Sequence, residues 1–557
     1  MRLRSPRILP FGSLLSGCAL AVLLAACGSG GGGTAATPAA AAAPNDSGTA
    51  LPAVDVGAVA AADPGSTLPE GWQHGAFMEI YVRGYQDSDG DGHGDLRGLT
   101  QRLDYLKDLG IKGIWLMPVT QSQDRDHGYA VADYRAIEAD YGTLADFDEF
   151  VKQAHARGIG VVIDYVMNHS AARHPLFLHA RAAPGNAYRS WYVWRDSAPG
   201  GWRVFGGDPW RATANGAYFA AFWDQMPDFN LRNTDVVAWH KSNLRFWLNR
   251  GVDGFRFDAV GNLVENGPSA WQNQPENYAL MNDIRATIAG YQRRYLVCEA
   301  PDDPLGFAAP AACGSAFAFG HQHAIVDAAR GSPTAIAAVA DYFKNAPAGM
   351  ATMASNHDSF AGARLWDRVN GDLAQYKLVA AAYLLQPGTP FIYYGEEIGM
   401  AGGLGLAGDP ALRAPMSWSA DPDNAGFTRG KPFRALAANA AAQNVAAQAN
   451  DARSLLSFYK AMLALRNTRP SLARGSYEGA FAAGGVLGFR RKLAGETTLV
   501  LINYGTAAAS AELDGLGANA TLRALHPVDA GSVGADAAGQ ARIALAPQSV
   551  LVYSLQP

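Results

Sequence analysis

The chain has 557 residues, of which 49% are hydrophobic, and a formal net charge of −5. A chain of this length can bury a large core and form two or three domains. The small net charge argues against a nucleic-acid partner and against binding to an anionic membrane through charge.

The first 26 residues have the layout of a secretory signal peptide. Three arginines precede an apolar run over residues 14–24, which is too short to remain as a membrane-spanning helix. The run ends in Leu-Ala-Ala-Cys at residues 24–27, which resembles a bacterial lipobox, where cleavage precedes a lipidated cysteine. We therefore expect lipidation at Cys27 and a lipid-anchored protein of the bacterial cell envelope. Gly28 after the cysteine favours the outer membrane. Ordinary cleavage nearby, with Cys27 unpaired, is the alternative.

Residues 27–75 are rich in Gly, Ala, Pro and Ser and have no periodic apolar spacing, which predicts a flexible linker. Beyond the signal peptide and Cys27, the remaining cysteines are Cys298 and Cys313. They could form a disulfide in an oxidising envelope. However, Cys298 lies in a predicted buried strand, where a free apolar cysteine is commoner, and both possibilities stay open.

Residues 76–470 carry the pattern of a barrel of β/α units. Three times an amphipathic helix ends in glycine and leads into a short apolar strand, at Gly110, Gly158 and Gly251. This pattern is typical of helices packed around a parallel sheet. With the other candidates there are eight strands, which favours a closed (β/α)8 barrel over an open doubly wound sheet. The predicted strands are 77–82, 111–117, 159–165, 252–258, 294–299, 316–319, 350–356 and 390–394.

Two further regions differ from the barrel in composition and hydrophobic pattern. Residues 169–235, after the third strand, are rich in aromatic residues, Gly and Pro, which predicts a loop-rich subdomain inserted over the carboxyl edge of the barrel. From residue 471 to 557 alternating stretches such as 486–490, 498–502 and 549–553 predict a C-terminal antiparallel β-sandwich.

Carboxylates stand at the ends of three predicted strands, where a closed barrel would gather them at one mouth. Asp258 ends the fourth strand, and Arg256, two residues earlier on the same face, would hold it ionised as a nucleophile. For this segment alone, a structural Arg–Asp pair is an equal alternative. Glu299 follows an apolar run and has no adjacent arginine, so we predict that it is the protonated acid; Asp358 follows the seventh strand. An ionised and a protonated carboxyl group together suit retaining glycoside hydrolysis.

Four segments that carry these residues resemble, in order, the sequence blocks of the α-amylase family of retaining glycoside hydrolases, which are (β/α)8 barrels acting on α-glucosidic bonds. The resemblance covers residues 76–557. It implies that Asp258 is the nucleophile, Glu299 the general acid/base and Asp358 the group that orients the sugar hydroxyls. The four segments are Asp164-Tyr165-Val166-Met167-Asn168-His169, Gly254-Phe255-Arg256-Phe257-Asp258, Val297-Cys298-Glu299 and Ser355-Asn356-His357-Asp358.

The resemblance also assigns substrate-binding residues. Tyr129 would stack on the glucosyl unit, while Asp126 and Arg413 could clamp its non-reducing end, as on the α-glucosidase and trehalose synthase side of the family. Residues 226–230 resemble a block found between neopullulanases and oligo-1,6-glucosidases. In contrast, Ala259 stands where enzymes favouring α-1,6 bonds tend to have Val. The assigned residues are Asp126, Tyr129, His169, Arg256, His357 and Arg413.

Residues 87–95 place carboxylates on alternate positions of a Gly-rich loop, as hard cations require. The loop resembles the start of an EF-hand, but Gly98 stands where the bidentate Glu is expected. Part of the amylase family binds calcium at the matching loop, so a structural Ca²⁺ is expected here, with a solvated acidic turn as the alternative. The expected ligands are Asp87, Asp89, Asp91, the carbonyl of His93, and Asp95.

The expected activity is endo-cleavage of α-1,4 bonds in starch or maltodextrin, as in α-amylases, because an envelope protein meets such polymers outside the cytoplasm. An exo-acting α-glucosidase, an oligo-1,6-glucosidase or a trehalose-synthase-like transglycosidase is the alternative. A non-catalytic starch-binding lipoprotein is a third possibility, against which the three carboxylates argue. We expect a monomer whose partners are an α-glucan and, through its lipid, the membrane.

Overall fold

The computed structural model describes residues 50–556. The predicted signal peptide, Cys27 and the first part of the linker lie outside the described residues and stay predictions. In the part of the chain that is described, no helix is long and apolar enough to cross a membrane.

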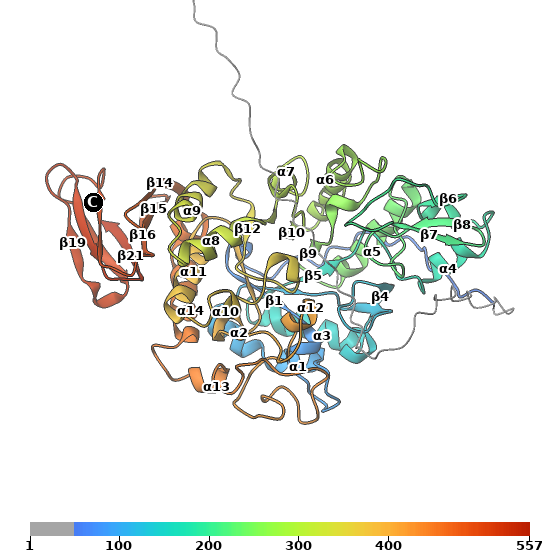
Figure 1. Ribbon diagram of the computed structural model, residues 1–557, viewed down its shortest axis with the longest axis horizontal. Coiled ribbons are helices and arrows are strands. Elements are labelled where there is room, and N and C mark those ends of the chain that lie inside the picture. The colour runs from blue at the N-terminus through green and yellow to red at the C-terminus, as the bar shows by residue number, and fades with distance from the viewer. Residues whose placement is uncertain (1–49, 557) are drawn as a thin grey trace, which may run out of the picture.

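Eight parallel strands close into a barrel at the centre of the molecule (Figure 1). All eight predicted strands are confirmed, and the differences are confined to their ends. The largest is at the seventh strand, which ends at Thr352 because the following residues leave the sheet at the mouth of the barrel. In order around the barrel the strands are β1 (Phe77–Ile80), β13 (Thr389–Tyr393), β12 (Met350–Thr352), β11 (Ala316–Phe317), β10 (Tyr295–Cys298), β9 (Gly254–Phe257), β5 (Gly160–Tyr165) and β2 (Gly113–Leu116).

Helices surround the barrel, and several of them begin at a side-chain cap. In α3 (Leu144–Ala156), Thr143 and Asp146 form a reciprocal capping box. Gly251, with φ of 96°, turns the chain from α5 (Thr234–Asn249) toward β9. The other helices are α1 (Leu96–Gln101), α2 (Leu103–Leu109), α4 (Pro175–Ala182), α6 (Pro275–Ala289), α7 (Pro304–Ala308), α8 (His321–Ala329), α9 (Pro333–Asn345), α10 (Leu365–Arg368), α11 (Leu373–Leu385), α12 (Asp409–Leu412), α13 (Val445–Gln448), α14 (Leu455–Thr468) and α15 (Pro470–Arg474).

The barrel interior changes from apolar to charged along the strands. Alternate residues of a strand point to the same face, so each strand contributes successive layers to the interior. One layer is part of a buried apolar cluster that includes Phe77, Trp115, Val162, Val297 and Phe391. Two positions further toward the mouth, the strands of Phe77, Val162 and Val297 carry Glu79, Asp164 and Glu299. The apolar layer therefore packs directly below the charged residues at the carboxyl end of the barrel.

Residues 50–75 lie against the barrel, so the flexible linker is shorter than predicted. The carbonyl of Asp55 accepts a hydrogen bond from Trp239 Nε1 at 3.1 Å, and Asp63 pairs with Arg294 at 3.2 Å. Leu68 and Trp72 are buried and join the apolar cluster inside the barrel. Composition did not reveal this, because an extended segment can bind through backbone carbonyls and two isolated apolar side chains without any periodicity.

As predicted, a separate subdomain is inserted after the third barrel strand, and the C-terminal region is antiparallel β-structure. The insertion after β5 contains α4 and a three-stranded sheet and lies to one side of the barrel (Figure 1). The C-terminal region has a six-stranded and a two-stranded antiparallel sheet whose side chains share one apolar cluster. The remaining strands are β3 (Thr120–Ser122), β4 (Val131–Ile137), β6 (Trp194–Arg195), β7 (Trp210–Thr213), β8 (Gly216–Phe219), β14 (Ser476–Ala483), β15 (Val486–Leu493), β16 (Glu496–Asn503), β17 (Ala509–Leu513), β18 (Thr521–His526), β19 (Ser532–Gly534), β20 (Ala541–Leu545) and β21 (Ser549–Gln556).

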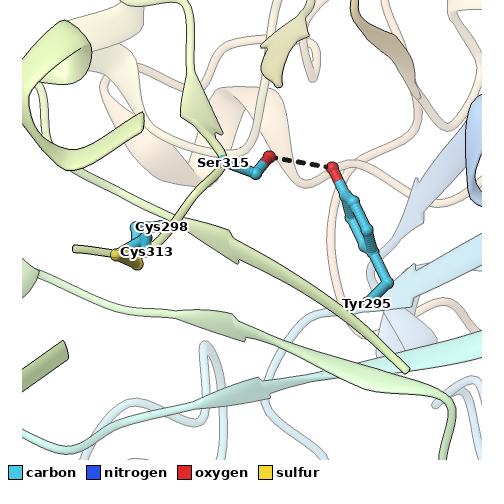
Figure 2. Close-up of a disulfide and its surroundings, with 4 residues drawn as sticks. All are labelled: Tyr295, Cys298, Cys313 and Ser315. Carbon is cyan, nitrogen blue, oxygen red and sulfur yellow. Dashed lines mark hydrogen bonds between the residues drawn. A yellow bond between two sulfur atoms is a disulfide. The ribbon is translucent and has the colours of Figure 1, made fainter. Parts of the chain in front are cut away.

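Cys298 and Cys313 form a disulfide, which decides between the two possibilities left open by the sequence (Figure 2). Cys298 is the last residue of β10, and Cys313 lies just before β11. The bond therefore closes the loop that carries α7 and begins at Glu299. It ties the end of the strand that presents Glu299 to the next strand of the barrel.

Candidate active site

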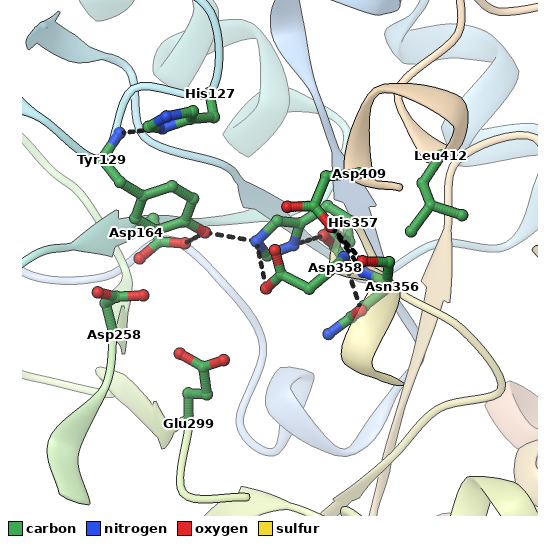
Figure 3. Close-up of polar contacts among 12 residues, drawn as sticks. His127, Tyr129, Asp164, Asp258, Glu299, Asn356, His357, Asp358, Asp409 and Leu412 are labelled. Carbon is green, nitrogen blue, oxygen red and sulfur yellow. Dashed lines mark hydrogen bonds and ion pairs between the residues drawn. The ribbon is translucent and has the colours of Figure 1, made fainter. Parts of the chain in front are cut away.

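The three predicted catalytic carboxylates meet at the carboxyl end of the barrel. Asp258 follows β9, Glu299 follows β10, and Asp358 lies six residues beyond the end of β12. Their carboxyl groups face a common space in Figure 3. All three side chains are less than one fifth exposed. Residues that are up to 100 positions apart in the chain therefore form one site.

Arg256 joins the carboxylates through a single guanidinium group. Its Nη1 lies 2.8 Å from Asp258 Oδ1 and 2.9 Å from Asp164 Oδ1, and its Nη2 lies 2.7 Å from Glu299 Oε2. The expectation that Glu299 has no arginine beside it is therefore wrong. Parallel pairing of β9 and β10 places Arg256 opposite Val297, two residues before Glu299, so its guanidinium reaches both neighbouring strand ends.

Burial and mutual repulsion raise the pKa values of the two acids that flank Arg256. Burial raises the pKa of Glu299 to about 7, and Arg256 opposes this rise. Burial likewise raises the pKa of Asp258 to about 6, again against the effect of Arg256. Of the two carboxyl groups, Glu299 has the higher pKa and therefore binds a proton more tightly than Asp258.

Asp358 belongs to a chain of charges that runs into the barrel. His357 Nε2 lies 3.0 Å from Asp358 Oδ2, and His357 Nδ1 lies 2.5 Å from Glu79 Oε1 (Figure 3 for His357 and Asp358). Burial acts to lower the pKa of His357, but the two carboxylates raise it to about 10. The imidazolium in turn holds the pKa of Asp358 well below its usual range, although burial opposes this. Asp358 is therefore a fixed anion.

Tyr129 contacts His357 in this chain of charges, and His169 is a buried neighbour of Tyr129. The Tyr129 hydroxyl donates to Asp164 Oδ2 at 2.9 Å and lies 2.7 Å from His357 Nε2, and its ring stacks on the His357 ring. Burial lowers the pKa of His169 to about 3, so its ring is neutral. Its Nε2 has no hydrogen-bond partner among the described residues. A buried polar atom of this kind is costly unless a ligand satisfies it.

Asp126 and Arg413 do not pair with each other, and each forms an ion pair with a different residue. Asp126 Oδ1 accepts hydrogen bonds from Tyr81 at 2.6 Å and from Arg434 Nη2 at 2.8 Å. Arg413 Nη2 lies 3.2 Å from Asp358 Oδ1 and also pairs with Asp409. Although burial opposes it, Tyr81 and the two arginines lower the pKa of Asp126. Ion pairs therefore cluster beside Asp358 at this edge of the site.

The acidic loop at residues 87–95 brings three of its carboxylates together. Oxygen atoms of Asp87, Asp89 and Asp95 lie within 4.8 Å of one another, whereas Asp91 is not in this group and accepts from the His93 backbone N–H. Asp87 and Asp95 are buried, and across residues 50–556 neither forms an ion pair with Lys or Arg. Buried carboxylates without a cation are expensive, so these three side chains fit a bound divalent ion.

Sequence reasoning missed three residues that complete the site. Glu79 could have been found, because it is an acid inside an otherwise apolar strand. Asp164 ends a strand inside a quoted block, yet its part in holding Arg256 had to be seen in space. Arg434 lies in a loop 308 positions from Asp126, and no local pattern marks it.

The comparisons agree with this geometry. The family profile described as "Alpha amylase, catalytic domain" matches residues 79–475. The chain is 33% identical to a probable α-glucosidase of Rhizobium meliloti over 500 residues, covering 79% of this chain and 91% of that protein. It is 34% identical to the trehalose-6-phosphate hydrolase of Escherichia coli, covering 78% and 91%.

Two further proteins are similar to this chain, one in sequence and one in structure. The chain is 29% identical to the oligo-1,6-glucosidase of Parageobacillus thermoglucosidasius, covering 73% of this chain and 85% of that protein. Among solved structures, the α-glucosyl transfer enzyme XgtA superimposes with a TM-score of 0.74 at 28% identity, covering 87% of this chain and all but 1% of that one. With its closed barrel and its gathered carboxylates, this protein is a member of the α-amylase family of glycosidases.

Proposed function

We propose that the protein is an exo-acting, retaining α-glucosidase that removes glucose from the non-reducing end of short α-glucosides. The observation that carries this proposal is a group of ion pairs beside the catalytic carboxylates, in which Asp126 pairs with Arg434 and Arg413 pairs with Asp358. An endo-acting enzyme needs an open cleft on both sides of the cleaved bond, because the polymer must pass through. In this proposal the ion pairs bind the terminal sugar and block the passage of a longer chain.

The relatives support the same choice. They are named α-glucosidase, oligo-1,6-glucosidase, trehalose synthase and trehalose-6-phosphate hydrolase, although one is named α-amylase. These names fit the exo-acting alternative better than the starch-cleaving endo-hydrolase expected from the sequence. That expectation gave weight to the envelope location, which does not bear on the shape of the site.

In the proposed first step, Asp258 attacks the anomeric carbon while Glu299 gives its proton to the departing oxygen. The charge chain Glu79–His357–Asp358 holds Asp358 as an anion that accepts hydrogen bonds from two sugar hydroxyls. His169 Nε2, which has no hydrogen-bond partner among residues 50–556, can bond a further hydroxyl. These contacts orient the sugar and strengthen as positive charge develops on its ring.

In the second step, Glu299, now ionised, takes a proton from water, and the water oxygen attacks the anomeric carbon and displaces Asp258. Loss of the proton from Glu299 is easier once Asp258 is esterified, because the neighbouring negative charge has gone. Arg256 stays in contact with both groups throughout. Two displacements at one carbon give glucose with the α configuration retained.

Chain-end specificity can be tested with maltoheptaose in two forms, one free and one blocked at its non-reducing end. We expect glucose from the free form and no product from the blocked form. Release of maltooligosaccharides from the blocked form would instead establish endo action. Maltose and isomaltose, compared in the same assay, report the preference between α-1,4 and α-1,6 bonds. The Glu299→Gln variant is the inactive control.

We also propose that the acidic loop binds a structural calcium ion through Asp87, Asp89 and Asp95. The loop is fastened to residues 427–433 by bonds such as Thr428 Oγ1 to Asp87 and Asp87 N to the Phe427 carbonyl, not to the catalytic carboxylates. The ion would therefore hold two distant segments together and take no part in bond cleavage.

Chelation should lower the melting temperature without changing the chemistry. An ion present at 100 times its dissociation constant stabilises the fold by about 2.7 kcal/mol, which for a chain of this size predicts a fall of roughly 2 to 3 °C on adding EDTA. Well below the melting temperature, kcat should stay the same. In the Asp89→Ala variant, EDTA should have no further effect. An equal response of the variant and the wild type to EDTA would contradict calcium binding at this loop.

A further inference from the structure

The contact between β10 and β11 has the fewest paired residues of any neighbouring strands in the barrel. One pair, Cys298 with Ala316, joins them in register, and β11 itself has two residues. On its other side, β10 pairs with β9 at four positions. Because backbone hydrogen bonds between paired residues hold a parallel sheet together, β10 is fastened firmly to β9 and weakly to β11.

Glu299, the proposed acid, follows β10 at this weak contact and is held mainly from the β9 side. Its N–H donates to the Phe257 carbonyl at 2.9 Å, and its carbonyl accepts from Val260 N at 3.2 Å. Its side chain accepts from Ala259 N at 3.1 Å. These three bonds all come from β9 or from the loop that follows it, so they do not fix Glu299 relative to β11.

The disulfide between Cys298 and Cys313 crosses from β10 to the start of β11 (Figure 2). Cys298 is the residue before Glu299, and Cys313 lies three residues before β11. Beside the disulfide, Cys298 N donates to the Ser315 carbonyl at 3.1 Å, and the hydroxyls of Tyr295 and Ser315 lie 3.2 Å apart. The disulfide therefore adds a covalent link where strand pairing is shortest, next to the acid.

The loop that the disulfide closes has a second attachment, which does not depend on the disulfide. The Tyr278 hydroxyl of α6 donates to Asp303 Oδ2 at 2.6 Å, and the Tyr278 ring stacks on Phe307 with 4.2 Å between ring centroids. These contacts lie four or more residues beyond Glu299. We therefore expect the loop to stay folded when the disulfide is broken, while the end of β10 becomes free to shift relative to β11.

A small shift of Glu299 should impair proton transfer more than sugar binding. A general acid must lie within hydrogen-bonding distance of the departing oxygen, and a displacement of about 1 Å can cost about a hundredfold in rate. Burial raises the pKa of Glu299, so a looser loop that admits water should lower this pKa. Both effects fall on the step in which Glu299 gives up its proton.

We propose that the Cys298–Cys313 disulfide positions the general acid, so that the enzyme cleaves ordinary α-glucosides at its full rate only when this bond is formed. The proposal rests on the proposed α-glucosidase function and adds redox control of the same site. Two thiols form the bond by losing two protons and two electrons, which a disulfide oxidant such as glutathione disulfide takes up to become two thiols. Disulfides persist in oxidising compartments and are rare in the cytosol, and the predicted signal peptide would carry the chain to such a compartment.

The test compares a substrate that needs the proton of Glu299 with one that does not. The departing sugar of maltose must be protonated, whereas fluoride leaves α-glucosyl fluoride without a proton. In the Cys298→Ala/Cys313→Ala double variant, we expect kcat/KM for maltose to fall about ten- to hundredfold and kcat/KM for the fluoride to fall much less. The alkaline limb of the maltose profile should move to lower pH. A lower melting temperature with an unchanged ratio of the two kcat/KM values would overturn the proposal.

Reduction of the wild type tests the same point without a substitution, in case the double variant does not fold. The full-length protein is incubated with dithiothreitol, which is oxidised to its cyclic disulfide, in a sub-denaturing concentration of urea because both cysteines are buried. The ratio of maltose to fluoride turnover should fall, and it should recover when glutathione disulfide replaces dithiothreitol. The double variant, treated in the same way, controls for the other cysteines. An unchanged ratio after thiol titration has shown reduction would overturn the proposal.

Thr143→Ala is the matched control for lost stability. It removes the side-chain cap of α3, so the melting temperature should fall while the substrate ratio stays unchanged. A fall in its ratio as large as that of the double variant would assign the effect to stability and overturn the positioning role. Failure of the wild type to cleave maltose and isomaltose overturns the proposed function itself, whereas cleavage with a ratio that ignores the disulfide overturns only its positioning role.

Discussion

Replacing Glu299 by Gln should lower kcat/KM for maltose by about a thousandfold, within the range typical of general acid–base catalysis. The carboxamide cannot protonate the departing sugar. α-Glucosyl fluoride, whose fluoride leaves without a proton, should lose much less in the first step. Its turnover should then stall at the glucosyl-enzyme, because no base activates water. Azide, which attacks without losing a proton, should restore turnover and give α-glucosyl azide.

The pH dependence of kcat/KM is a second test of the prediction that Glu299 is the general acid. Glu299 must hold its proton, so the wild-type kcat/KM for maltose should fall as pH rises through its pKa of about 7. Asp258 must be ionised, so the rate should also fall as pH drops below about 6. In its residual kcat/KM for maltose, Glu299→Gln should lack the alkaline limb, because an amide does not titrate. Glu276→Gln, at an exposed carboxylate of α6, is the matched control. An alkaline limb that persists in Glu299→Gln would assign the acid to another group.

Replacing Arg256 by Lys should lower kcat/KM by roughly a hundred- to ten-thousandfold, because bidentate arginine sites do not tolerate lysine. One ammonium cannot reach the three carboxylates that the guanidinium contacts within 2.9 Å. Since Arg256 opposes the rise in the pKa of Asp258, its loss should raise that pKa further. The acid limb of the pH profile should therefore move to higher pH.

Arg294→Lys is the matched control for this substitution. Arg294 is as buried as Arg256 and also pairs with two carboxylates, Asp63 and Asp253, but these lie at the opposite end of the barrel. We expect a lower melting temperature and an unchanged pH profile. Similar pH profiles for the two variants would mean that Arg256 is only a structural cation, which was the alternative left open by its sequence segment alone.

The barrel could be predicted from sequence because its signals are local. A helix ending in glycine before a short apolar strand can be recognised within one short segment, as at Gly110, Gly158 and Gly251. The three carboxylates followed from the same reasoning, since Asp258 and Glu299 directly follow their strands and Asp358 lies in the loop after β12. Closure of the barrel brings the residues at its strand ends together, even when they are far apart in the chain.

The remaining features depend on contacts between residues that are far apart in the sequence, which no single segment can reveal. Arg256 reaches Glu299 from a neighbouring strand, so the absence of an adjacent arginine in the sequence was misleading. Arg434 and Asp126 meet only because two long loops fold toward each other. The strap at residues 50–75 binds through backbone carbonyls, which any composition can supply. The ion pairs of Asp126 and Arg413, on which the proposed exo action rests, are of this kind.

Mass spectrometry of the stalled glucosyl-enzyme tests the central claim most directly. Glu299→Gln is incubated with α-glucosyl fluoride, quenched in acid and digested, and the peptides are sequenced. The predicted result is one added glucosyl unit, bound as an ester on Asp258. A glucosyl unit on a different side chain, or rapid release of β-glucose with no adduct, would contradict a double displacement through this carboxylate.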